Sequence, residues 1–122
     1  MFTAIVLDEK SRAILQAFAC NYCDYKTARL LCHHVTLAFG SNALPEGWTF
    51  GETREVTADA VGMITGRILA VRVSGVERPD GKIPHVSLAT FGEGKPKEAN
   101  AICDWQPLAV PVVLRGKVEL CK

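Results

Sequence analysis

One short segment of this chain is written twice. His-Val-Thr-Leu-Ala-Phe-Gly runs from 34 to 40, and His-Val-Ser-Leu-Ala-Thr-Phe-Gly runs from 85 to 92. In each copy a histidine and a hydroxyl residue alternate with aliphatic residues, and side chains two apart on a strand project from the same face. We therefore expect two strands of one design, each with an apolar face that packs in a core and an opposite face that carries the histidine and the hydroxyl.

The rest of the chain predicts more strands and few helices. Apolar and β-branched residues gather between turn formers in six segments, so we expect strands over 2–7, 33–39, 56–64, 68–76, 84–91 and 112–121. Asp8 is suited to cap a helix over 9–20, in which Ile14, Leu15 and Phe18 would form the packing stripe. A short second helix is expected near 97–105, ended by Pro107 and Pro111. This order indicates the α+β class in a single domain over residues 1–122.

Composition narrows the function classes. Lys and Arg number 14 against 13 for Asp and Glu, so the chain has no broad positive field with which to hold a DNA duplex. No apolar run approaches the roughly 20 residues that cross a bilayer, which argues against a membrane protein. The chain has five cysteines, an odd number. Its apolar start runs straight into the charged residues Asp8, Glu9 and Lys10, which is not the pattern of a secretory signal peptide. We expect a monomer with free thiols in the cytoplasm.

The polar face of the repeat suits acid-base chemistry at a phosphate. Opening a cyclic phosphodiester requires one group that takes a proton from the attacking water and one that gives a proton to the departing sugar oxygen. Histidine, with a pKa near ~6.5, can do either at neutral pH. His34 and His85 are therefore the candidate acid-base pair, and the hydroxyls of Thr36 and Ser87 could donate hydrogen bonds to the phosphate oxygens. This chemistry needs neither metal nor cofactor.

With these residues in place, the sequence resembles the two-histidine (2H) phosphoesterases, which include 2′,3′-cyclic phosphodiesterases and bacterial 2′-5′ RNA ligase-like proteins. Their signature is a pair of His-x-Thr/Ser-x motifs in which x is usually apolar. The segments 34–37 and 85–88 both match it, including the apolar residue after each hydroxyl. The order of strand, helix and motif is also similar, so the resemblance extends along the whole chain.

The resemblance implies a fold and a set of reactions. The fold would consist of two pseudo-symmetric lobes of antiparallel strands, with one motif strand in each lobe and a shared central cleft. The activity would be hydrolysis of 2′,3′-cyclic phosphates on RNA 3′ ends or small nucleotides to 2′-phosphates, with cyclic or 2′-5′ linked signalling nucleotides as the other substrate branch. The chain is short for the family and has Ser in its second motif, which bears on substrate size. Which histidine is the base stays open.

Several other residues are candidate substrate contacts. Lys95 follows the second motif in a glycine-rich loop and could approach an anion, and Trp48 in a polar loop is the best candidate for a base platform. The remaining aromatic candidates, for which core packing is the simpler role, are Tyr22, Tyr25 and Trp105. His33 should point to the face opposite His34 and act as a packed or hydrogen-bonded residue.

Two alternatives from other function classes stay open. The first is a non-catalytic module that binds a nucleotide or an RNA end in the same cleft. The second is a zinc-binding domain, because Cys20 and Cys23 have the spacing of a zinc knuckle and Cys32 and His33 follow. Adjacent residues on opposite faces of a strand fit a tetrahedral site poorly, so buried free thiols are the simpler interpretation.

Overall fold

The computed structural model describes residues 1–24 and 26–122 and consists mainly of antiparallel strands. In chain order the elements are β1 (Phe2–Leu7), α1 (Glu9–Ala19), β2 (Ala28–Leu30), β3 (His34–Phe39), β4 (Thr53–Ile64), β5 (Ile68–Ser74), β6 (His85–Phe91), the 3₁₀ helix η1 (Pro96–Ala101) and β7 (Gln106–Cys121). The predicted α+β class is confirmed, and all six predicted strands are present: β1 has the predicted bounds, and the other five differ at one end.

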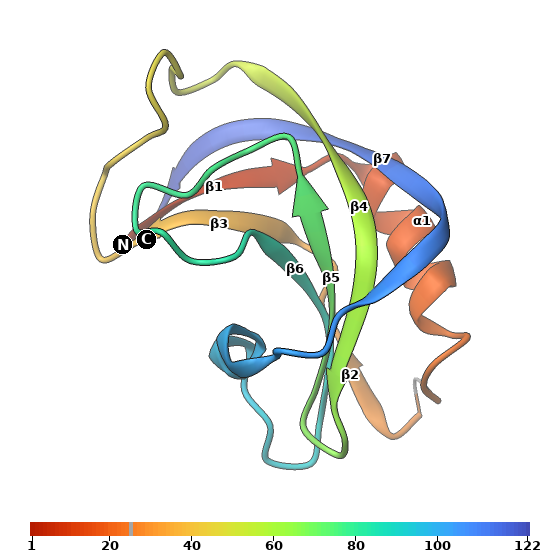
Figure 1. Cartoon of the computed structure of the whole chain (residues 1–122). Helices are drawn as coiled ribbons and strands as arrows, with labels where there is room; N and C mark the ends of the chain where they lie inside the picture. Colours follow the sequence, from red (N-terminus) through yellow and green to blue (C-terminus); the bar gives the residue numbers. More distant parts are fainter. Residues whose placement is uncertain (25) are drawn as a thin grey trace.

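The strands form one sheet that closes on itself. Their order is β2-β6-β3-β1-β7-β4-β5, and β5 also pairs with β6, so six strands make a closed barrel while β2 extends the far end of β6. β4 and β5 form the hairpin expected around Gly66, with Ile64 paired to Ile68. The long β4 and β7 curve around one side, and β1, β3, β6 and β5 complete the ring (Figure 1). The two motif strands, β3 and β6, are therefore direct neighbours.

The apolar face of the repeat lies in the main core, as predicted. Val35 and Leu37 of β3 and Val86 and Leu88 of β6 are fully buried and belong to one cluster with the interior residues of the other strands. Burying such a side chain contributes about 1.5–3 kcal/mol to the free energy of folding. This packing fixes the rotation of both strands, and so it fixes the direction in which their alternate residues point.

Helix α1 covers one side of the sheet. Its predicted cap is confirmed, because a carboxylate oxygen of Asp8 accepts a hydrogen bond from the backbone N of Ser11 at 2.8 Å. Leu15 and Ala19 are buried and Phe18 packs against the same core, whereas Ile14 is 38% exposed. The expected stripe was wrong at Ile14, since the helix packs through Ser11, Leu15 and Ala19, which are four residues apart.

The two prolines near the end of the chain do not separate a helix from a strand. Contrary to the sequence-based expectation, Pro107 and Pro111 both lie within β7. The partner strand β1 pairs only with the part of β7 from Gly116 onward, so among the described residues no strand pairs with one edge of the first half of β7, where a missing N–H costs little. The pairing with β4 is also irregular between Ala58 and Ala60, opposite these prolines.

The 3₁₀ helix η1 packs on the face of β5 that points away from the main core. It is shorter than the helix expected over 97–105, and a small second core of Ile68, Ala70, Ala99 and Ile102 holds it. Leu69 and Val71 of β5 meanwhile point into the main core, so this strand is buried on both faces. η1 and α1 therefore lie on opposite sides of the sheet (Figure 1).

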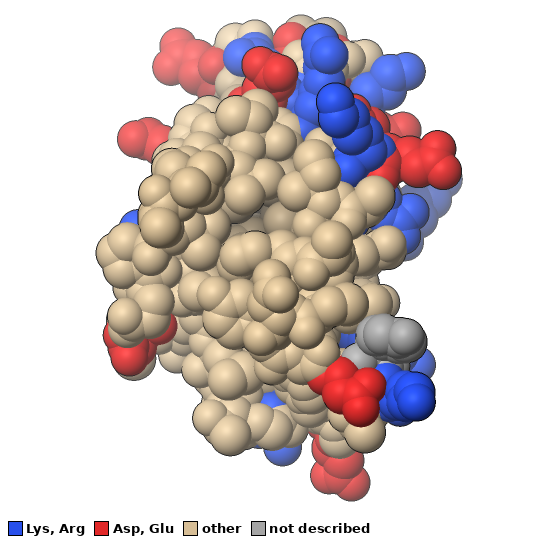
Figure 2. All heavy atoms as spheres, turned by 90° about the vertical axis from the view of Figure 1, so that its right-hand side faces the viewer, with Lys and Arg blue, Asp and Glu red and all other residues tan. Residues whose placement is uncertain are grey.

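Charged side chains are unevenly distributed over the surface. Seen from the right-hand side of Figure 1, a broad area carries few charges, and charged residues gather mainly above and below it (Figure 2). Val110 and Val113 of β7 are among the exposed apolar side chains, at 77% and 58%. Within the part of the chain that the structure describes, no helix has the length and apolar character that a membrane crossing requires.

Candidate active site

The two motifs meet across one strand pair. β3 and β6 are antiparallel, with Val35 opposite Val86. In such a pair, one residue back on one strand faces one residue forward on the other, so this register places His34 beside Ser87 and Thr36 beside His85. Because the two valines point into the core, these four polar residues point to the other side of the sheet.

All four residues line one pocket. Its volume is about 960 Å³, and its wall includes His34, Thr36, His85 and Ser87. Binding pockets for small molecules measure about 300–1,000 Å³, so there is room for more than the phosphate that two histidines would contact. The structure thus brings together the four residues that the sequence singled out as catalytic.

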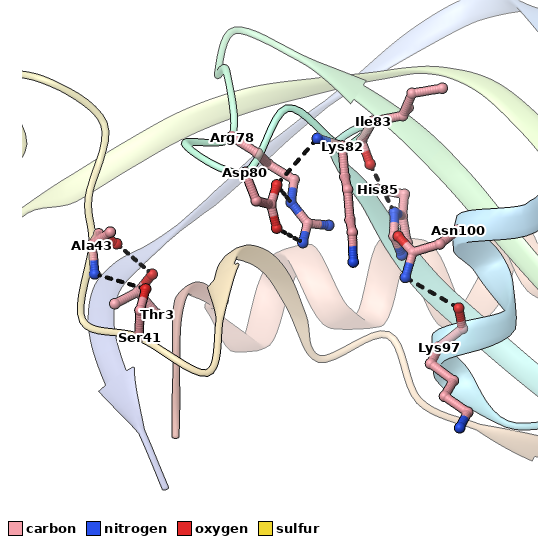
Figure 3. A network of polar contacts seen from close by, with 10 residues as sticks. All are labelled: Thr3, Ser41, Ala43, Arg78, Asp80, Lys82, Ile83, His85, Lys97 and Asn100. Atoms are coloured by element: carbon pink, nitrogen blue, oxygen red, sulfur yellow. Dashed lines mark hydrogen bonds and ion pairs between the residues drawn. The ribbon is translucent and has the colours of Figure 1, made fainter.

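His85 is held in a defined orientation. Its side chain is buried, and its Nδ1 lies 2.9 Å from the carbonyl oxygen of Ile83 (Figure 3). A carbonyl only accepts hydrogen bonds, so Nδ1 carries the hydrogen and Nε2 is the ring nitrogen left for a ligand. Burial lowers the pKa of His85 and the charge of Arg78 lowers it further, while the bond to Ile83 opposes both.

His34 is the more strongly perturbed histidine. Burial, with smaller contributions from the charges of His33 and His85, lowers its pKa from 6.5 to about 4. The ring of Phe2 lies against it, with ring centroids 5.1 Å apart. His34 is therefore neutral at pH 7 in the empty site, and the effect of His85 on it reflects their closeness.

His33 does not occupy the position expected from strand alternation. We predicted that it would point to the opposite face, but it is exposed, lines the same pocket, and places its Nδ1 3.1 Å from Nδ1 of His34. The reason is local: β3 starts only at His34, and Cys32 has a φ of 53°, so the chain turns before the strand begins. A third histidine thus joins the site.

The two hydroxyl residues differ in their surroundings. The Oγ of Ser87 donates to the carbonyl oxygen of Pro96 at 3.3 Å, which ties the second motif to the start of η1. The side chain of Thr36 makes no hydrogen bond to any residue that the structure describes, so its hydroxyl is available to a ligand. A bound phosphate would compete with the long Ser87 contact.

Three cationic residues that the sequence did not single out also line the pocket. They are Arg78, Lys82 and Lys97. Arg78 and Lys82 come from the turn before β6, within seven residues of His85, so their closeness in sequence to a motif histidine was the available signal. Lys95, which we expected to approach the substrate, is exposed at the start of η1 and is not part of the wall, whereas Lys97 is.

The aromatic residues of the pocket are also different from those expected. Trp48 packs against the main core with the guanidinium of Arg54 4.3 Å from its ring centroid, and it does not line the pocket. Phe2 and Phe39 do line it, with their rings nearly parallel and centroids 6.2 Å apart. Phe39 is 75% exposed and lies within the first repeat copy, directly before Gly40. Of the other aromatic candidates, Tyr22 contacts Phe18 and Trp105 packs near η1, while Tyr25 lies outside the described residues.

The cysteine cluster does not assemble a metal site. Cys20 is exposed, Cys23 is partly buried, and Cys32 is fully buried, where burial raises its thiol pKa to about 11. Among residues 1–24 and 26–122, no three side chains of His, Cys, Asp or Glu come close enough to share a metal ion. The described geometry gives the zinc alternative no support.

Comparison with known proteins does not identify a family, so any functional assignment depends on the geometry of the site. A scan against protein-family models finds no matching family, and searches of curated proteins and of solved structures find no significant match.

Proposed function

We propose that this chain is a metal-independent cyclic phosphodiesterase that uses His34 and His85 as its acid-base pair. The observation that carries the proposal is the convergence of two histidines, His85 buried and His34 partly buried, and two hydroxyl residues on one pocket, from neighbouring strands with the same sequence pattern. His34 and His85 come from segments about fifty residues apart, so chance pairing is a poor account of the arrangement.

The chemistry follows from the groups present. One neutral imidazole accepts a proton from the attacking water, and the other, protonated when the anionic phosphate is bound, gives a proton to the departing ribose oxygen. Thr36 and Ser87 donate hydrogen bonds to the non-bridging oxygens, on which charge accumulates. Nε2 of His85 is the reacting atom of that ring, since Nδ1 is bound to Ile83. A neutral imidazole in the empty site becomes an acid because the phosphate charge raises its pKa.

The proposal includes the internal symmetry that the family resemblance implies. We propose that β3 and β6 are equivalent motif strands of two pseudo-symmetric halves with a shared cleft. Support comes from their antiparallel pairing at Val35 and Val86, which sets each histidine beside the hydroxyl of the other motif. In such an arrangement either histidine can act as base, depending on the direction in which the substrate lies.

The substrates that best fit this pocket are RNA 3′ ends or small nucleotides with a 2′,3′-cyclic phosphate. A phosphate would lie over the motif residues, and Phe39, exposed and stacked on Phe2, offers a platform for the base. Arg78, Lys82 and Lys97 make the wall locally positive in a chain whose net charge is only +1. Local rather than global charge favours a short ligand.

The test is hydrolysis of an oligonucleotide that ends in a 2′,3′-cyclic phosphate, in the presence of EDTA, with separation of 2′- from 3′-phosphate products. Wild type should turn over, and His34→Ala and His85→Ala should each lose about a hundredfold or more. His33→Ala is the matched control for removal of a pocket imidazole and should lose much less.

Two other outcomes of this experiment would overturn parts of the proposal. In the first, the wild-type protein binds the cyclic end yet hydrolyses neither it nor any member of a panel of cyclic and 2′-5′ linked nucleotides. That result would overturn the enzyme proposal in favour of a binding module. Hydrolysis that EDTA abolishes would overturn the metal-independent mechanism.

A further inference from the structure

The pocket wall carries more cationic side chains than one reacting phosphate needs. Three cations line the wall, Arg78, Lys82 and Lys97, against one carboxylate, Glu98. Both oxygens of that carboxylate are already engaged, one by Arg67 and the other by the backbone N of Lys95. The reacting phosphate already has four candidate partners in the two motifs, so the cations form a separate feature.

Arg78 is built into the wall and does not sample solvent freely. Its residue is only 6% exposed, and its Nε and Nη2 donate to the two carboxylate oxygens of Asp80 at 2.9 and 2.6 Å (Figure 3). Among the described residues Nη1 has no hydrogen-bond partner, which leaves the other edge of the guanidinium available. An arginine fixed by a carboxylate in this way is pre-organised to bind an anion.

The turn that carries Arg78 also sets Lys82 beside it. The backbone N of Gly81 donates to the carbonyl of Arg78, and the backbone N of Lys82 donates to Asp80 at 3.1 Å. Figure 3 shows Lys82 between Arg78 and His85, with its side chain directed along the pocket wall. Within the described part of the chain its ammonium group has no ion-pair partner. Two donors from one turn therefore border the His85 side of the site.

We propose that Arg78 and Lys82 form a second phosphate subsite, which selects substrates that carry a phosphate on the 5′ side of the ribose whose 2′,3′-cyclic phosphate is opened. The inference rests on the proposed function, because it takes the motif residues as the site of the reacting phosphate. Such a phosphate can be the 5′-phosphate of a mononucleotide or the internucleotide linkage of an RNA end.

The first measurement is binding of reaction products, which does not depend on turnover. The affinity of adenosine 2′-phosphate is compared with that of adenosine 2′,5′-bisphosphate by calorimetry. We expect the bisphosphate to bind at least about tenfold more tightly, since hydrogen bonds between charged groups commonly contribute that much or more. Lys82→Gln should remove most of this difference, and Lys10→Gln, an exposed lysine on α1, should leave it unchanged.

Lys82 is the better position to change because it is exposed, and among the described residues its side chain has no hydrogen-bond or ion-pair partner. Arg78→Gln would remove the charged partner of Asp80, which also accepts from the backbone N of Lys82 in the same turn, so Arg78→Lys is the second variant. It keeps the charge but loses the two-nitrogen contact with Asp80, and it should reduce the preference for the bisphosphate.

The second measurement compares kcat/KM for three substrates with a 2′,3′-cyclic phosphate: adenosine, 5′-phosphoadenosine and the dinucleotide ApA. The two with a 5′-side phosphate should exceed adenosine by about tenfold, and a higher value for one of them identifies the source of that phosphate. Equal affinity of the two products, or a preference that survives in Lys82→Gln, would overturn the subsite while hydrolysis stands. A bisphosphate preference without hydrolysis of any substrate would support the subsite and overturn the proposed reaction.

Discussion

His33 and His34 face each other through their Nδ1 atoms, which lie 3.1 Å apart. Two imidazole nitrogens at this distance share one hydrogen, so one ring donates and the other accepts. His33 is adjacent in the sequence to a motif histidine, yet it contributes to the pocket because the backbone turns at Cys32.

The first prediction concerns this pair. His33→Ala should raise the pKa of His34 above its value of about 4, since the charge of His33 is one of the causes that lower it and the smaller side chain admits water. NMR titration of the His34 ring measures this directly. His85→Ala should raise the same pKa by less, because His85 contributes less to the shift. An unchanged His34 titration in His33→Ala would show that the two rings are not coupled.

The second prediction is the pH dependence of the reaction. In the free protein the pKa of His34 is about 4 and that of His85 lies below 6.5, so above pH 6.5 both rings are neutral and the general acid is lost. We therefore expect kcat/KM to be highest between about pH 4 and 6.5 and to fall as the pH rises further. The maximum of kcat should lie at higher pH, because a bound phosphate raises both pKa values. A kcat/KM that climbs from pH 7 to 9 would contradict this assignment.

The third prediction concerns stability. The pKa of His34 is lower in the folded than in the unfolded chain, so between about pH 6.5 and 4 the unfolded state binds more protons. The free energy of unfolding should then fall as the pH drops through this range, by on the order of 2 kcal/mol from His34 between pH 7 and 5. Urea unfolding of wild type and His34→Gln at both pH values measures it. The variant should show a clearly smaller loss, and parallel curves for the two proteins would disprove the coupling.

The fourth prediction tests the base platform. Phe39→Ala should raise KM for a cyclic nucleotide by about tenfold with a small change in kcat, since stacking on one base contributes about 1–3 kcal/mol. Phe50→Ala is the control, because Phe50 is 43% exposed but does not line the pocket. If both variants have the same KM, the base does not stack on Phe39.

The repeat is where the sequence was most informative about the fold. Polar and apolar side chains alternate in the repeat, and this alternation indicates which residues share a face of the strand. It correctly placed Val35 and Leu37 in the core and His34 and Thr36 away from it. The Asp8 cap is equally local, since it depends on a hydrogen bond that spans three residues. Patterns of this kind depend only on backbone geometry, so they can be recognised without knowing the fold.

The prolines and His33 mark the limit of such reasoning. Whether Pro107 can lie in a strand depends on whether the neighbouring edge is paired, and that is decided by the length of β1 elsewhere in the chain. His33 follows no alternation, because a turn at Cys32 precedes the strand. In both cases a local rule was overruled by the arrangement of a distant or adjoining segment.

The sequence by itself determined the four motif residues, which face of each strand they occupy and the general class of the fold, because each follows from a short-range pattern of polar and apolar residues. The tertiary structure alone decided that β3 and β6 are paired neighbours, that Phe39 rather than Trp48 borders the pocket, and that Arg78 and Lys82 stand beside His85. These facts depend on strand order and register, which are set by how all six strands close around one core and not by the residues of any one segment.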